Sequence, residues 1–408
     1  MTKAMDDLLA ALKNAAALYA SDEKVSGADA KKPLTPCPLP RSIIEHVDSA
    51  MDSVPEIIDL TNLRQRSLGT SQSYKLHKFL LASALTRRTF DLGSASQAVQ
   101  EVLYLVDKNI TYPRIVMILA GVETPSIIEL PQGAALVSLN DLKTPSWMKE
   151  FFDKKLWPLS RSFEPVAPSA ALVMRVPFGP VFTDQEAIDP SFPEQELDFL
   201  RALVNCIALA AEGPIAIVKA WFEDDDPRLP LLTSGVAFSD PRWGSSAAAP
   251  YVVDPERIKK VISDYTNFED RKDAVHTALS RLAGAWEGWH REERAIDLGL
   301  ALEAVLMYTP GRNPDNSEIS YKIGLRAAWV LGETPDDRMA IFQQSRHLYR
   351  YRSEAAHSGL IKTKLDTWRN VDNEIEAGIV LVGRIIAAVL AHKSWPNWNE
   401  LVLRGTRL

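Results

Sequence analysis

The chain has little of what several common classes of protein require. Its 408 residues include only two cysteines, Cys37 and Cys206, which are too few and too far apart for a zinc site or a disulfide framework. Arg384 interrupts the longest apolar stretch, so we expect no membrane-spanning helix, which needs about 18 apolar residues in a row. The first ten residues carry Asp6 and Asp7 where a signal peptide needs basic residues. These absences favour a cytoplasmic protein with reduced thiols.

Nucleotide-binding and hydrolase signatures are also missing. The chain contains no Gly-x-Gly-x-x-Gly, no Walker A sequence, no Gly-x-Ser-x-Gly elbow and no His-Glu-x-x-His. The acidic run at 224–226 could bind a divalent cation, but its position between an expected strand and Pro227 is more typical of a solvated turn. We therefore expect no cofactor and no metal site.

Charge is distributed unevenly between the two ends of the chain. Hydrophobic residues make up 46% and charged residues 24%, as in a globular protein of two or three domains. The net charge is −7, yet residues 271–408 alone carry +2 and residues 1–270 carry −9. We therefore expect any affinity for a polyanion to be local to the C-terminal part.

Three regions are predicted along the chain, and together they indicate an α+β fold. Residues 1–40 form an amphipathic helix and a proline-rich linker. Residues 41–270 have mixed α and β character, and residues 271–408 are expected to be all-helical. Within the middle region we expect strands at 114–120, 170–176 and 213–222 and a helix at 194–211.

The C-terminal region is expected to contain helices at 294–307, 318–332, 335–358 and 368–392. Asp315 and Glu318 could form a capping box for the second of these, which Gly332 can end. Thr334 is a natural N-cap for the third, and Gly359 can take the left-handed conformation that stops it.

The end of that third helix carries an arginine and a histidine that can act on a phosphodiester. The forked guanidinium of Arg352 can bind a phosphate oxygen, and the imidazole of His357 can take and give a proton near neutrality, without a metal. Five residues of ideal helix turn through roughly 140°, so the two side chains do not project together. Either Arg352 bends round toward His357, or a second copy of the domain completes the site.

The spacing alone is not specific, because Arg41/His46 and Arg271/His276 share it and are most simply surface residues. The surroundings of the last pair differ, since residues 338–369 contain seven Lys/Arg against two acids, a local charge of +5. The flanking residues predicted to contact a nucleic acid are Arg346, His347, Arg350 and Lys362.

Two further groups of residues have alternative interpretations. The segment 286–294 could stack bases on Trp286 and Trp289, although its rings more simply pack the end of the helical bundle. Glu303 could pair with Arg326 or Arg352, or it could occupy an ordinary exposed helix position.

The order of these helices resembles the HEPN superfamily, and in particular its Apea-like branch, over residues 281–392. The segments that carry the resemblance are LGLALEAVLM, EISYKIGLRAAWVLG and LYRYRSEAAHSG. The resemblance implies an all-helical bundle that dimerises and, in many members, cleaves RNA through an Arg-x(4–6)-His motif, here Arg352 and His357. Ser353 departs from the pattern, because the superfamily often has Asn, Asp or His after the arginine.

Two functional hypotheses follow from the residues and the resemblance. In the first, the chain is a metal-independent endoribonuclease of a defence system, of abortive-infection or toxin-like type. It acts on RNA as a homodimer, and residues 41–270 sense a protein or ligand trigger. In the alternative, it is a non-catalytic HEPN module that binds RNA or protein and dimerises. Ser353 favours the alternative, whereas the Arg352/His357 pair and the basic stretch favour the first.

Overall fold

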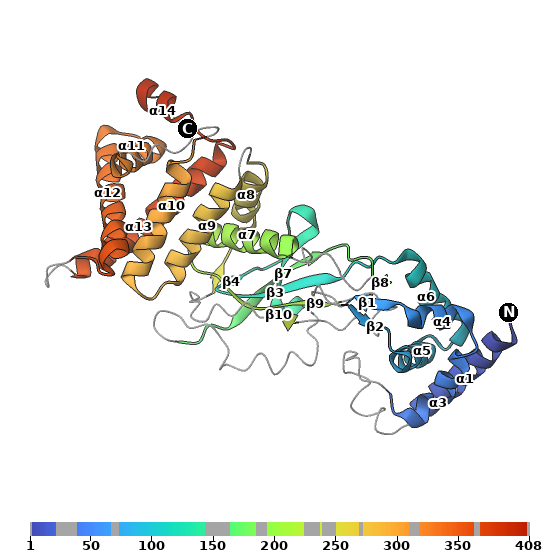
Figure 1. Ribbon diagram of the computed structural model, residues 1–408. Coiled ribbons are helices and arrows are strands. Elements are labelled where there is room, and N and C mark those ends of the chain that lie inside the picture. The colour runs from blue at the N-terminus through green and yellow to red at the C-terminus, as the bar shows by residue number, and fades with distance from the viewer. Residues whose placement is uncertain are drawn as a thin grey trace.

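The computed structural model describes residues 2–21, 39–66, 73–142, 164–184, 194–223, 237–238, 250–268, 272–309, 318–362 and 368–405. Figure 1 shows three groups of elements: helices near the N-terminus, a β-sheet in the middle and a helical group at the C-terminal end. The predicted α+β composition with a helical C-terminal region is confirmed.

The N-terminal group is a small helical cluster beside a short sheet. Its helices are α1 (Lys3–Ser21), α3 (Arg41–Met51), α4 (Pro55–Asn62), α5 (Lys78–Leu92) and α6 (Ala95–Lys108). Helix α1 packs against α3 and α5 and buries Leu8 and Leu12 completely. The helix predicted at the start of the chain thus shares a core with residues 41–108. Most of the predicted proline-rich linker lies outside the described residues.

The central sheet has six antiparallel strands in the order β10-β9-β3-β7-β6-β5. Their bounds are Ala237–Phe238, Ala216–Glu223, Arg114–Ala120, Pro168–Arg175, Ala134–Ser138 and Ile128–Glu129. The three predicted strands are therefore confirmed, the last of them over a shorter range. Smaller sheets join β1 (Arg64–Arg66), β2 (Ser73–Lys75) and β8 (Phe182–Thr183), and β4 (Val122–Glu123) with β11 (Tyr251–Val252).

Two helices connect the sheet to the C-terminal group. Helix α7 (Glu194–Ala211) has the bounds that its apolar pattern predicted, and it packs against α8 (Pro255–Thr266) and α9 (Lys272–Glu287). Cys206 on α7 is a buried free thiol, and burial raises its pKa. Cys37 lies outside the described residues.

The C-terminal group is a bundle with α10 (Arg291–Leu306) at its centre. Helix α10 packs against α9, α12 (Pro335–Ser358) and α13 (Trp368–Ala391), and α11 (Ile319–Leu331) packs against α12. The four predicted helices of this region are present, and α14 (Trp398–Arg404) is an additional short one. The predicted buried face of α13 is confirmed: Ile375, Ile379, Val382, Ile386 and Val389 are all buried.

The ends of α12 are those that the sequence predicts. The Thr334 hydroxyl accepts a hydrogen bond from the Asp337 backbone N–H, the Asp337 carboxylate accepts one from the Thr334 N–H, and Gly359 takes a φ of 72°. The capping box predicted for α11 is wrong. Glu318 stands at the N-cap position itself with a left-handed φ of 55° and makes no side-chain cap hydrogen bond, while Asp315 lies outside the described residues.

Within the described ranges, no helix is both long enough and apolar enough to cross a membrane.

Candidate functional site

Arg352 lies at the interface between α12 and α10. Its aliphatic stem crosses α10 at Gly299, where a Cβ atom added to the glycine would lie 2.5 Å from the Cβ of Arg352. Atoms of two side chains do not approach so closely, so only glycine at this position lets the stem pass. The small residue on α10 therefore fixes the path of the arginine.

Glu303, one turn further along α10, receives the guanidinium. Its Oε1 lies 3.2 Å from Nη2 of Arg352, and the two side chains are 26% and 25% exposed. Of the partners that the sequence allowed for Glu303, the structure thus selects Arg352. Arg326 instead donates to the backbone carbonyl of Leu306. The Nε atom of Arg352 is buried and has no hydrogen-bond partner among the described residues, so the arginine retains an unused donor.

Tyr349 completes this group, which we call the Arg352 cluster: Gly299, Glu303, Tyr349 and Arg352. The guanidinium carbon of Arg352 lies 5.6 Å from the centre of the Tyr349 ring. Burial raises the pKa of Tyr349, and the charge of Glu303 and a hydrogen bond to it raise the pKa further, against the opposing charge of Arg352. Sequence reasoning missed Tyr349, although its place three residues before Arg352 puts it on the same side of the helix.

His357 lies in the last turn of α12 and is exposed. Among the described residues it has no hydrogen bond or ion pair. The structure therefore does not join the two motif residues within one chain, because Arg352 is directed to Glu303 on α10 while His357 is exposed at the helix end. Of the two arrangements considered from helix geometry, bending of Arg352 round to His357 is not the one observed.

The other predicted contact residues lie on the exposed side of α12 and just after it. Arg346 and Arg350 are exposed and stack on aromatic rings one helical turn back or adjacent, those of Phe342 and Tyr351. Nδ1 of His347 lies 3.6 Å from Oε2 of Glu374 on α13. The same carboxylate oxygen accepts a hydrogen bond of 2.6 Å from the Tyr351 hydroxyl.

Lys362 follows the helix, and its backbone N–H donates to Oε2 of Glu354 over 2.9 Å. That carboxylate also lies 3.9 Å from Nε of Arg350, through its other oxygen. The structure thus brings Arg346, His347, Arg350 and His357 to one exposed side of α12, while Arg352 belongs to the packed side. The roles of Glu354 and Glu374 as local partners of these cations were not foreseen.

The rival residues separate clearly in the structure. Trp286 is 6% exposed and packs in the bundle, whereas Trp289 is 40% exposed. His46 and Arg41 are exposed as expected, His276 is partly buried, and Arg271 lies outside the described residues, as does the acidic run at 224–226. The described part of the chain contains no group of three or more His, Cys, Asp or Glu residues placed to hold a metal ion.

No protein-family model, curated protein or solved structure matches the chain. The resemblance to the HEPN superfamily therefore remains a prediction that rests on helix order and on the Arg352/His357 motif.

Proposed function

We propose that the chain is a metal-independent endoribonuclease in which Arg352 binds the scissile phosphate and His357 transfers protons. The observation that supports this most is the pairing, at the end of one helix, of an arginine with an unused buried donor and an exposed histidine without a partner in the described residues. These are the two functions that phosphodiester transfer requires of a protein.

RNA supplies its own nucleophile, because a 2′-hydroxyl lies next to each phosphate. One imidazole removes the 2′-hydroxyl proton as the O2′–P bond forms, and a protonated imidazole gives a proton to O5′ as the P–O5′ bond breaks. Arg352 offsets the charge that develops on the non-bridging oxygens. The products are a 2′,3′-cyclic phosphate and a 5′-hydroxyl.

A homodimer supplies both imidazoles. His357 is exposed at the end of α12, so two copies of this helix end meeting about a two-fold axis bring two histidines and two arginines to one phosphate. In this arrangement each histidine performs one of the two proton transfers. The further proposal that the enzyme serves a defence system of abortive-infection or toxin-like type, triggered through residues 41–270, rests on the resemblance to Apea-like HEPN proteins.

One observation favours a second candidate, a non-cleaving module that binds RNA or protein. Glu303 already pairs with Arg352, so a phosphate must compete with a carboxylate for the guanidinium. Ser353 after the arginine also departs from the pattern of cleaving HEPN proteins.

Incubation of the purified protein with end-labelled RNA in EDTA distinguishes the two. Alanine at Arg352 or at His357 should each lower cleavage about a hundredfold or more, while His46→Ala and His276→Ala should cleave normally. If the His357→Ala protein is as active as the unmodified one, the catalytic assignment is wrong. RNA that binds but stays intact with every variant supports the second candidate.

A further inference from the structure

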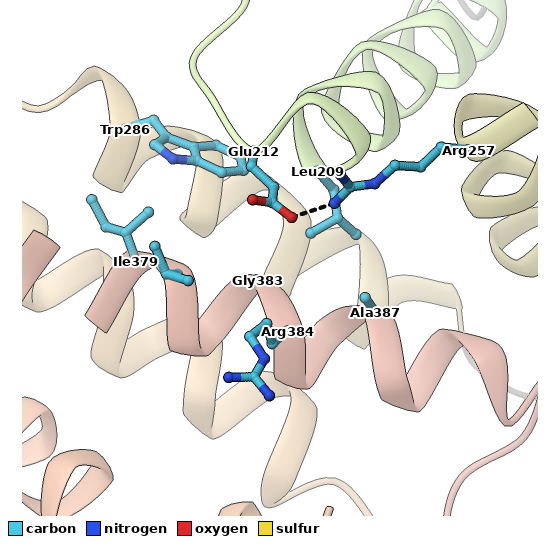
Figure 2. Close-up of a pocket in the computed structure, with 9 residues that line it drawn as sticks. Leu209, Glu212, Arg257, Trp286, Ile379, Gly383, Arg384 and Ala387 are labelled. Atoms are coloured by element: carbon cyan, nitrogen blue, oxygen red, sulfur yellow. Dashed lines mark hydrogen bonds and ion pairs between the residues drawn. The ribbon is translucent and has the colours of Figure 1, made fainter. Parts of the chain in front are cut away.

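A hollow lies where α7 and α8 meet the bundle, between α9 and α13 (Figure 2). Its volume is about 70 Å³, enough for several water molecules or for a small organic group entering from solvent. We call it the α13 pocket. Its walls are mainly apolar, and they come from Leu209 on α7, Trp286 on α9, and Ile379 and Val380 on α13.

Gly383 forms part of the pocket on α13, and packing does not require a glycine there. A Cβ atom added to it would lie 3.5 Å from Cδ1 of Leu209 and 3.7 Å from Cδ2 of Leu282, which is ordinary contact. Glycine in a helix interior costs about 1 kcal/mol relative to alanine. By contrast, a Cβ at Gly378 on the same helix would collide with Leu348. Gly383 is therefore a glycine that weakens the helix and leaves the pocket open.

A second local departure from the most stable backbone lies at the edge of the same pocket. Glu212 follows α7 with a φ of 55°, a left-handed conformation that non-glycine residues seldom adopt. Its carboxylate pairs with the guanidinium of Arg257 on α8, as Figure 2 shows. Sites where local preferences are violated by the surrounding structure are concentrated at ligand-binding regions.

The charges at the pocket leave one cation for a ligand. Arg257 is paired with Glu212, and in Figure 2 Arg384 projects from α13 on the side away from that pair. Arg384 is exposed, and no hydrogen bond or ion pair joins it to another described residue. With Glu212, Arg257 and Arg384 as its only charged wall residues, the pocket carries a net charge of +1. An anion with an apolar body complements both the charge and the walls.

We propose that the α13 pocket binds a small organic monoanion, an aromatic carboxylate whose ring lies on Gly383 near Trp286 and whose carboxylate pairs with Arg384. The site is independent of the Arg352 cluster and of the ribonuclease proposal. Because its walls come from α7 and α8 as well as from α9 and α13, an occupant contacts helices from both sides of the seam between the sheet region and the bundle.

Binding of 4-fluorobenzoate to the full-length chain, followed by ¹⁹F NMR line broadening, tests the proposal. We expect Gly383→Ala to weaken binding about tenfold or more by filling the pocket, and Arg384→Gln to weaken it by a similar factor through loss of the charged hydrogen bond. Lys259→Gln, which removes an exposed cation of α8 outside the pocket, should bind as the unmodified protein does. The neutral probe 4-fluorobenzamide should bind weakly to all of them.

The Gly383→Ala protein remains interpretable because alanine fits the space and favours the helix, so its Tm should be unchanged or higher. Loss of 4-fluorobenzoate binding in a protein of undiminished Tm supports the site. Absence of binding to the unmodified chain, or equal affinity in the Gly383→Ala or Arg384→Gln protein, overturns the proposal.

Discussion

Glu303 of α10 and Arg352 of α12 form an ion pair, with 3.2 Å between Oε1 and Nη2. The arginine proposed to bind phosphate is therefore held in place by a carboxylate before any RNA arrives. Both side chains are about one-quarter exposed, so solvent screens their attraction and a phosphate can compete for the guanidinium. Glu303 thus sets the resting position of Arg352 at the cost of weaker anion binding.

Replacement of Glu303 by glutamine should strengthen RNA binding. The amide oxygen can still accept from Arg352 and Tyr349, so the arginine keeps its position, but the negative charge that repels phosphate is gone. Against an effective dielectric constant near 20, such a change is worth severalfold to about tenfold in affinity. Fluorescence anisotropy with a labelled RNA at low salt measures it.

Glu293→Gln is the matched control, because it removes an exposed carboxylate from the same helix about 15 Å along its axis. It should change RNA affinity little. Equal strengthening by both substitutions would show that only the overall charge matters and that Glu303 has no particular hold on Arg352.

Alanine at Gly299 should displace the arginine. The added Cβ would collide with the stem of Arg352, so either the arginine or α12 must move, which costs about 1–3 kcal/mol in the free energy of unfolding. Urea denaturation measures that loss, and RNA cleavage by the folded variant should fall with it. Gly383→Ala serves as control, since its methyl group meets only ordinary contacts. An unfolding free energy that Gly299→Ala leaves unchanged would contradict the close packing.

Local signals account for what the sequence predicted well. β3 and α7 have their predicted bounds because an apolar β-rich run between turns and an amphipathic run are each legible within a single segment. Helix α12 was bounded correctly because Thr334 and Gly359 act within one turn of themselves. The capping box predicted for α11 failed because Glu318 takes the N-cap position itself.

Contacts between distant segments were beyond the same reasoning. The sequence offered Glu303 two possible arginines, and the choice of Arg352 depends on Gly299 letting α12 approach α10. The α13 pocket combines residues from four helices, so no single stretch of sequence announces it. The likeness of Arg352/His357 to the two other Arg-x4-His pairs was separable by context, but whether the pair meets across a dimer is not encoded in one helix.

The N-terminal cap of α12 should contribute to stability in a pH-dependent way. Hydrogen bonds with the Thr334 side chain and backbone hold the pKa of Asp337 below its ordinary value of 3.8. Because the folded-state pKa is depressed, this contribution is fully present above 3.8 and is lost as the pH falls through the lowered value. Asp337→Asn should therefore lose stability at pH 7 and differ less from the unmodified protein in acid.

The measurement is urea denaturation at pH 7 and at pH 3. Thr334→Ala should cost about 1 kcal/mol at pH 7, as other N-cap substitutions do. Asp336→Asn provides a control, because Asp336 lies in the same turn but has no part in the capping box. A gap between Asp337→Asn and the unmodified protein that is the same at both pH values would contradict the assigned linkage.

Assembly about a two-fold axis should be required for RNA cleavage. Arg352 is directed to α10 and His357 is exposed at the end of α12, so one chain presents only one imidazole for two proton transfers. Light scattering should show a dimer at concentrations where RNA is cleaved, and cleavage per chain should fall on dilution below the dimer dissociation constant. Addition of excess His357→Ala protein provides a sharper test. It draws unmodified chains into mixed dimers that hold one imidazole at the shared site, so cleavage per unmodified chain should decrease. The same excess of His46→Ala, which keeps His357, should add activity. If excess His357→Ala leaves cleavage per unmodified chain unchanged, the site is complete within a single chain and the composite arrangement is wrong.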